Sequence, residues 1–454
     1  MTRTAKFSKV CTPEDRAASP YSYLPIDVPS GCAGLAIELE YDTSAGVLDL
    51  GCFGPNGFRG WSGGARSRYV ITPTSATPGY LAGELEPGEW QVVLGLHRIA
   101  TSKLRYQVTA TIGSVEPDPE SPVSTPASGY LPGSPVSTPA SGYVPASVPE
   151  RPPRRELPAE SGWRWLAGDL HAHTVHSDGS LTIDELAALA AGQGLDFLAV
   201  TDHNTVSHHP YLAAAGARAG LTLIPGQEVT THRGHANAFG DVGWIDFRKP
   251  ADSWVREVSG RGGLLSVNHP LAGDCSWREP LTVRPPLAEI WHWSWMDRRW
   301  GGPMAWWLAW DPATIPIGGS DFHRPDQGRP IGQPTTWVLC HDGDTDTATA
   351  PTTFGAAEAA SERGEAAVGR ASEASQILEA LAAGRTSVSA AREGPVLLRM
   401  GDEVLAVDAE GAILADQSGR RRLVRGPMEA FRARDEPGPQ WLEDGNTGVL
   451  ALCR

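Results

Sequence analysis

The strongest constraint on the fold is a regular alternation, between Trp163 and Gly319, of short apolar runs and segments with helical periodicity. The runs WLAGDL, LDFLAV, LTLIPG, GGLLSVN and TIPIGG predict buried strands. The segments between them predict helices over about 183–193, 210–220, 251–260 and 304–311. Alternation on this scale is typical of a parallel α/β fold, most simply a barrel.

The rest of the chain divides by composition. Short Val-, Ile- and Tyr-rich runs separated by Gly and Pro predict an N-terminal β-sandwich over 20–113. Residues 114–160 are a Pro/Ser/Thr-rich linker in which SPVSTPASGY occurs twice, which predicts an extended spacer. The α/β domain then covers 161–392, with a low-complexity insertion at 341–375, and a small β-rich region follows at 393–454.

Charge and composition exclude several classes of function. With 38 basic and 53 acidic residues the net charge is −15, which disfavours binding to nucleic acid. No apolar run approaches the roughly 20 residues of a membrane span, and the first thirty residues lack a signal-peptide core. We therefore expect a cytoplasmic protein that uses no membrane, with the N-terminal module as a candidate surface for homo-oligomers.

Histidine is concentrated in the α/β region, where 11 of the 13 residues lie between His171 and His323. Side chains that bind metals follow five of the predicted strands, and the carboxyl ends of parallel strands are where functional groups gather. These residues are His171 and His173, Asp202 and His203, Glu228, His269, and Asp321 and His323.

The spacing within these groups suits a metal site. In an extended segment, residues two apart face the same side, so His171 and His173 can share an ion, as can Asp321 and His323. Asp169 is predicted to accept a ring N–H from one of these histidines. The six cysteines include no C-x-x-C pair, and His/carboxylate ligands favour Zn, Mn or Fe. Without a metal, so many buried imidazoles would be costly.

The segment GDLHAHTVHSDGSLTIDELAALAAGQGLDFLAVTDHN closely resembles the opening of the PHP (polymerase and histidinol phosphatase) family. IPGQEVTTHRGHANAFG, NHP and GGSDFH resemble its later motifs, in an order most similar to the branch that includes the carbaryl hydrolases. The resemblance covers about 161–340. It implies a distorted seven-stranded β/α barrel that binds two or three divalent ions.

The resemblance also implies a ligand set. The first ion would be bound by His171, His173 and Asp321, and Glu228 would bridge it to the second. His269 and His235 would complete the second ion, and Asp178, His203 and His323 would bind the third. Asp202 would support rather than ligate. One departure is His292, which follows Glu289-Ile290-Trp291 where this branch commonly has Asn.

These assignments predict a metal-dependent hydrolase, specifically a phosphoesterase that attacks a small anionic phosphate mono- or diester with a metal-bridging hydroxide near Glu228. His176 is the candidate to assist the leaving group, and Arg233 and Arg324 are candidates to bind the anion. Because no candidate ligand precedes Asp169, we expect the sandwich to be dispensable for catalysis.

Two alternatives remain open, and one rival barrel is disfavoured. The same ions could hydrolyse a carbamate, ester or amide, and some of Trp291, Trp293 and Trp295 could wall a pocket for an aromatic or nucleobase group. The domain could bind metal without catalysis. An amidohydrolase-type barrel would need a carboxylated lysine at a strand end, but the one lysine between 161 and 340 is Lys249, beside Pro250 in a predicted loop.

Overall fold

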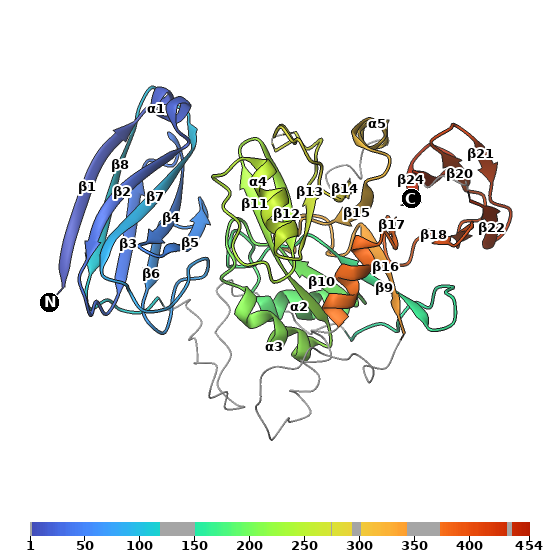
Figure 1. Cartoon of the computed structure of the whole chain (residues 1–454), viewed down its shortest axis with the longest axis horizontal. Coiled ribbons are helices and arrows are strands. Elements are labelled where there is room, and N and C mark those ends of the chain that lie inside the picture. The colour runs from blue at the N-terminus through green and yellow to red at the C-terminus, as the bar shows by residue number, and fades with distance from the viewer. Residues whose placement is uncertain (1, 119–149, 274, 293–300, 343–372, 434–437) are drawn as a thin grey trace, which may run out of the picture. The chain divides into compact units, whose positions relative to one another are not determined.

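A computed structural model describes residues 2–118, 150–273, 275–292, 301–342, 373–433 and 438–454 (Figure 1). Most of the linker and of the low-complexity insertion therefore lies outside the described residues, as do Trp293 and Trp295. The chain forms two compact units. The first comprises Met1–Val144, His173–Thr182 and Asp202–His208, and the second comprises Pro145–Ala172, Ile183–Thr201 and His209–Arg454. None of the described helices is long and apolar enough to cross a membrane.

The N-terminal part of the first unit consists of two antiparallel sheets of four strands each (Figure 1). One sheet has the order β1 (Arg3–Cys11), β8 (Leu104–Ile112), β3 (Leu35–Tyr41) and β6 (Arg68–Ile71). The other has the order β2 (Tyr21–Val28), β7 (Gly88–Ile99), β4 (Gly46–Gly54) and β5 (Gly57–Gly63), and α1 is Pro13–Ala18. Apolar side chains from both sheets form one core, which includes Leu24, Ile37, Trp90 and Val108.

Strand β1 lies before residue 20, which was the predicted first residue of the sandwich. It pairs with β8 along its whole length, from Arg3 opposite Ile112 to Cys11 opposite Leu104. Its side chains are mostly exposed, so RTAKFSKVC lacks the apolar alternation that marks a half-buried strand. The sandwich therefore begins at Arg3, because β1 joins it through backbone hydrogen bonds, which leave no such pattern in the sequence.

The second unit contains a large sheet whose first strands carry the candidate ligands. The order β15-β14-β13-β12-β11-β10-β9-β16 comprises β9 (Trp163–Asp169), β10 (Phe197–Val200), β11 (Thr222–Thr231), β12 (Gly234–Phe239), β13 (Leu264–Val267), β14 (Leu287–His292), β15 (Ile315–Gly319) and β16 (Thr335–His341). The helices are α2 (Ile183–Gly192), α3 (His209–Ala219), α4 (Ala251–Gly260) and α5 (Gly301–Trp310), and α2 packs against α3 (Figure 1). The expected α/β architecture is therefore present.

The strand directions differ from an all-parallel barrel. β9, β10, β11, β13, β14 and β15 share one direction, but β12 and β16 are antiparallel to their neighbours. Only two residues, His232 and Arg233, separate β11 from β12, and so short a connection produces an antiparallel hairpin. Among the described residues no sheet is closed, so the closed barrel predicted from the sequence is not confirmed.

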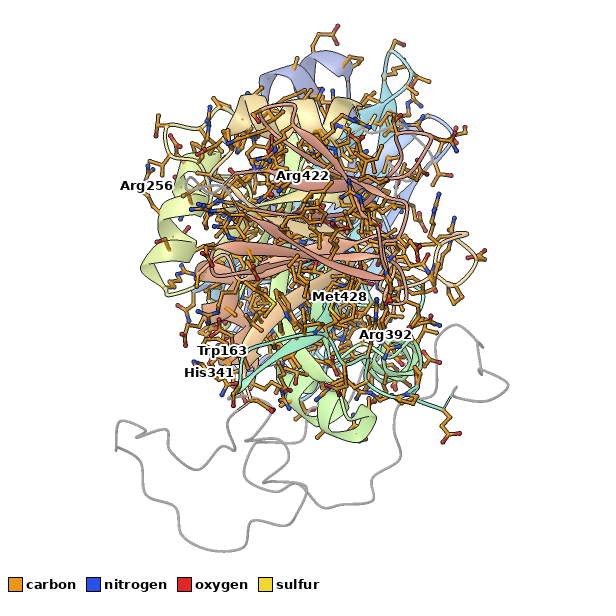
Figure 2. The ribbon with its side chains drawn as sticks, turned by 90° about the vertical axis from the view of Figure 1, so that its right-hand side faces the viewer. Trp163, Arg256, His341, Arg392, Arg422 and Met428 are labelled. Carbon is orange, nitrogen blue, oxygen red and sulfur yellow. The ribbon has the colours of Figure 1, made fainter. Side chains whose placement is uncertain are left out.

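The C-terminal strands continue this sheet through β17 (Thr386–Ser389), β24 (Val449–Cys453), β23 (Gln440–Glu443), β20 (Ile413–Asp416) and β21 (Arg421–Leu423). The same C-terminal region also forms a separate three-stranded sheet of β18 (Val396–Met400), β19 (Glu403–Val407) and β22 (Met428–Arg432). A further helix over 373–382 contributes Ile377 and Leu381 to the α/β core. At one end of β9, the ring of Trp163 lies against that of His341 of β16, with centroids 3.6 Å apart and the ring planes tilted by 32° (Figure 2).

Candidate metal centre

Glu228 lies inside β11. The sequence had predicted that it follows the end of this strand. Parallel pairing of β10 with β11 ends at Val200 opposite Pro225, and β11 then continues as one arm of the hairpin with β12. Glu228 is opposite Asn237 in this hairpin, and Thr230 is opposite His235. Since residues two apart share a face, Glu228 and His235 point to the same side of the hairpin.

Several donors converge on one oxygen of Glu228. Its Oε1 lies 3.3 Å from Nε2 of His171, 3.1 Å from Nδ1 of His235 and 3.2 Å from Nε2 of His269. The side-chain amide of Asn268 donates to the same oxygen at 2.9 Å. Glu228, His171 and His269 are buried, and three imidazoles around one buried carboxylate are the donor set of a divalent-metal site.

Asp321 joins the same group from the loop that follows β15. Its Oδ1 lies 3.2 Å from Nε2 of His171, and its Oδ2 lies 3.3 Å from Nε2 of His292. His323 turns its Nδ1 toward the backbone carbonyl of Asp321, 2.9 Å away. The second unit therefore brings together the predicted ligands His171, Glu228, His235, His269 and Asp321, with His323 beside Asp321.

Glu289 of β14 is a buried residue of this site that was not among the predicted ligands. Its Oε1 lies 2.7 Å from Nδ1 of His171, and its Oε2 accepts the backbone N–H of His269 at 2.8 Å. A Cβ on Gly319 would lie 2.1 Å from Glu289 Oε1 and 2.6 Å from Cβ of His171. Only glycine at this position therefore leaves room for the carboxylate against the imidazole.

Two of the predicted ligands have backbone conformations that are unusual for their residue types. His269 has φ +26° and Asp321 has φ +50°, and neither is glycine. Non-glycine residues in this region are uncommon and cluster at functional sites, because the surrounding structure must compensate for the strain. At His269 part of that compensation is visible, since its N–H is bound by Glu289.

The electrostatics of the group favour a cation. Burial alone would lower the pKa of His171, but the carboxylates of Glu289, Glu228 and Asp321 raise it well above its ordinary value. His269 has the same balance, with burial opposed by Cys275 and Glu228, and its pKa is also raised. In the absence of a metal these groups attract protons, and divalent ions fit the same donors and the same negative potential.

A second set of predicted ligands lies in the first unit. The rings of His173 and His203 stack with centroids 4.3 Å apart, and Nε2 of His203 lies 3.6 Å from Oδ1 of Asp178. These residues belong to the loops His173–Thr182 and Asp202–His208. The loops thus bring together three of the predicted ligands, two imidazoles and one carboxylate.

Asp202 acts as the tie between these loops, in agreement with the supporting role expected for it. It accepts hydrogen bonds from the backbone N–H of Thr174 at 2.8 Å, from Oγ1 of Thr174 at 2.6 Å and from Oγ of Ser177 at 2.6 Å. Its Oδ2 also lies 3.2 Å from Nδ1 of His208. Both carboxylate oxygens are therefore used in cross-linking one loop to the other.

The prediction for Asp169 was wrong. Its carboxylate accepts backbone N–H groups of His171 at 3.1 Å, Ser320 at 3.0 Å and Gly332 at 2.8 Å, and does not orient an imidazole ring. Burial raises its pKa against the effect of these donors. Asp169 instead fastens β9 to the segments after β15, and Glu289 orients the His171 ring.

The predicted substrate contacts occupy different surroundings. His176 is buried with its Nδ1 2.7 Å from Oγ of Ser207. Arg233 is half-exposed, and its Nη2 donates to the carbonyl of Arg278. The Arg324 side chain is 65% exposed and pairs with Asp326 at 3.2 Å. The described contacts thus bring neither arginine into the group around Glu228.

Sequence reasoning also missed Cys275 and the role of His292. Sγ of Cys275 lies 3.4 Å from Nδ1 of His269, on the opposite side of the ring from Glu228. His292 is buried with its ring centroid 4.8 Å from that of His269. The one signal for His292 in the sequence was that it stands where this branch of the family commonly has Asn.

Two residues that entered the alternative predictions lie in other surroundings. Trp291 is buried in an apolar cluster, and Lys249 pairs with Glu257 at 3.4 Å.

Comparison with known proteins gives a family match for part of the chain, which includes His171, His173, Asp178, His203, Glu228 and His235. Residues 169–268 match the PHP domain family. Over 64 residues the chain is 39% identical to a 5'-3' exoribonuclease of Haemophilus influenzae, covering 14% of this chain and 23% of the relative. Over 66 residues it is 41% identical to a 3',5'-nucleoside bisphosphate phosphatase of Chromobacterium violaceum, again covering 14% and 23%. The chain spans about a quarter of the length of these curated relatives.

A solved structure from Bacteroides vulgatus, a two-domain protein containing a predicted PHP-like metal-dependent phosphoesterase, has 18% sequence identity to this chain and a TM-score of 0.36. The alignment covers 67% of this chain and 91% of that one. Residues 169–268 are thus similar to PHP domains, and the curated relatives that match part of this chain are named as a ribonuclease and a phosphatase.

Proposed function

We propose that the protein is a metal-dependent phosphoesterase that hydrolyses a small, anionic phosphate mono- or diester. The observation that carries the proposal is the convergence of His171, His235 and His269 on Oε1 of Glu228. The names of the curated relatives, an exoribonuclease and a nucleoside bisphosphate phosphatase, point to phosphate esters as the substrate class.

We propose further that the predicted ligands bind two or three ions of Zn, Mn or Fe in all. These ligands would be His171, His173, Asp178, His203, Glu228, His235, His269, Asp321 and His323. Support comes from the contacts within each group, around Glu228 in the second unit and between His203 and Asp178 in the first. When bound, the ions would lower the pKa of a coordinated water and polarise the phosphoryl oxygen.

The chain's own residues have distinct tasks in this proposal. Glu228 would supply negative charge to the bound cations, and Glu289 keeps Nε2 of His171 turned toward Glu228 and Asp321. His176, anchored through Nδ1 to Ser207, is the candidate to protonate the leaving group. Arg233 and Arg324 would attract the anionic substrate from solution, since both are substantially exposed.

A side-by-side hydrolysis screen tests this function. The full chain is loaded separately with Mn, Zn and Fe and assayed on a phosphomonoester, a phosphodiester and an aryl carbamate. We expect turnover of at least one phosphate ester that is lost in Glu228→Gln. Turnover of the carbamate with neither phosphate ester cleaved would replace the proposal by a carbamate hydrolase, and metal binding without any turnover would leave a non-catalytic metal module.

A further inference from the structure

Two loops that carry predicted ligands are hydrogen-bonded to the N-terminal β-sandwich. The backbone N–H of Gly79 donates to Oγ of Ser207 at 3.0 Å, and Oγ1 of Thr205 donates to the carbonyl of Gly79 at 2.8 Å. Both peptide groups of one sandwich glycine are thus used by the loop Asp202–His208. Thr205 and Ser207 are buried, so neither bond is exposed to competing water.

The loop His173–Thr182 is held from the sandwich by a second contact. Nη2 of Arg66 donates to the backbone carbonyl of Val175 at 2.8 Å, between the predicted ligands His173 and Asp178. The Ser207 hydroxyl that accepts from Gly79 also lies 2.7 Å from Nδ1 of His176 in this loop. The sandwich therefore contacts both loops, and Ser207 links one to the other.

The fit at Gly79 depends on the absence of a side chain. Gly79 has φ +99°, and a Cβ at this position would lie 2.8 Å from the carbonyl oxygen of Trp61 and 2.9 Å from that of His176. Both neighbours are backbone atoms, which cannot rotate away as a flexible side chain can. Any larger residue must therefore push the His176 backbone out of place.

The Asp178 side chain itself is 46% exposed. The backbone of its loop is fastened by Arg66 at Val175 and, through the ring of His176, by Ser207.

We propose that the sandwich is a positioning module for the metal centre, in which Gly79 and Arg66 place the loops that carry His173, Asp178 and His203. This inference rests on the proposed function, since it assigns these three residues to a metal ion. It replaces the expectation that a cut in the linker leaves catalysis intact. That expectation rested on the absence of candidate ligands before Asp169. The ligand loops, however, are hydrogen-bonded to Arg66 and Gly79, more than 100 positions earlier in the chain.

Matched variants of the full chain test the inference. Gly79→Ala is compared with Gly57→Ala, because Gly57 has φ +120° and a Cβ there would meet no atom within 4 Å, so the conformational cost is similar without the clash. Arg66→Ala is compared with Arg68→Ala, since Arg68 forms an exposed ion pair with Glu38 at 3.3 Å. Ions per chain are measured by elemental analysis, alongside circular dichroism and kcat.

We expect Gly79→Ala and Arg66→Ala each to lose about one ion per chain at a metal concentration that saturates wild type, and to lower kcat roughly ten-fold or more. Arg66→Lys should restore part of the metal content, because it can still donate to Val175. Full metal content in both variants would overturn the inference, as would equal losses in the Gly57 and Arg68 controls. Because metal content is measured without a substrate, failure of the phosphoesterase assay does not affect this result.

Discussion

Oε1 of Glu289 lies 2.7 Å from Nδ1 of His171, while Oε2 of the same carboxylate binds the backbone N–H of His269 at 2.8 Å. One side chain on β14 therefore orients predicted ligands that follow two other strands, β9 and β13. Burial would raise the pKa of Glu289, but the surrounding imidazoles, His171 foremost, lower it. Glu289 therefore stays ionised, and with a metal bound it would favour a His171 proton on Nδ1 and leave Nε2 as the ligand atom.

Glu289→Gln should weaken metal binding with the fold retained. Glutamine has a similar shape, but it loses the negative charge and cannot accept from both donors. We expect the metal dissociation constant to rise about 10- to 100-fold, as is usual when the hydrogen-bond partner of a ligating histidine is lost. Titration against a chromophoric chelator measures the change. Glu257→Gln, at a partly exposed ion pair with Arg261, is the control, and equal affinities in the two variants would contradict the assigned role.

Glu228→Gln should lose an ion and lower kcat by orders of magnitude, because two cations about 3.5–4 Å apart would lose the anion between them. Metal content and turnover are measured beside wild type. His97→Gln, at an exposed sandwich position, is the appropriate control. His209, which has no predicted ligand role, is less suitable, since its Nε2 lies 2.9 Å from the carbonyl of Gly226, two residues before Glu228. Normal metal content in Glu228→Gln would refute the bridging assignment.

Removing the metal should lower both activity and thermal stability. A bound cation would hold together the buried carboxylates Glu228 and Glu289 and the imidazoles around them. At about 1,000 times its dissociation constant, such a ligand would stabilise the native state by about 4 kcal/mol. We expect a fall in Tm after dialysis against a chelator and recovery on adding Mn or Zn. Elemental analysis showing only traces of metal, even after reconstitution, would exclude a multinuclear centre.

Asp49 should make stability depend on pH. Its pKa is raised by burial from 3.8 to about 7 in the folded protein, so the native state keeps a proton that the unfolded chain releases. This contribution to the free energy of unfolding is present below about pH 4 and is lost as the pH rises through about 7. Asp49→Asn, measured by Tm against pH in metal-free protein, should be more stable than wild type above pH 7, with the difference vanishing near pH 4. Parallel profiles would show that Asp49 titrates normally.

The strand-end pattern was sufficient to find most of the candidate site, because parallel strands bring their carboxyl ends together wherever the residues lie in the chain. His171, His269 and Asp321, which follow three different strands, lie together around Glu228. The pattern could not assign Glu289, which lies within β14 in an apolar run and meets His171 across 118 positions of sequence. It also misplaced Glu228, because TLIPGQEVTT continues as a strand beyond the proline and glycine that suggested its end.

The error for Asp169 has a different cause. Alternation along β9 correctly set its face relative to His171, but the pattern carries no information on which backbone N–H groups will approach a buried carboxylate. Those of Ser320 and Gly332 come from segments more than 150 residues away. The composition of residues 114–160 likewise predicted a spacer. It carried no information on the hydrogen bond between Gly79, before the spacer, and Ser207, after it.

The first unit combines the N-terminal sandwich with two loops that come later in the chain, and this order affects folding during synthesis. All the strands of the sandwich lie before residue 113, so its pairings, including β1 with β8, can be complete before the ligand loops leave the ribosome. The loops Asp202–His208 and His173–Thr182 would then emerge onto a surface that already presents Gly79 and Arg66. The N-terminal module would in this way act as a template during translation, and moving it to the C-terminal end of the gene would remove that advantage even where every contact could still form.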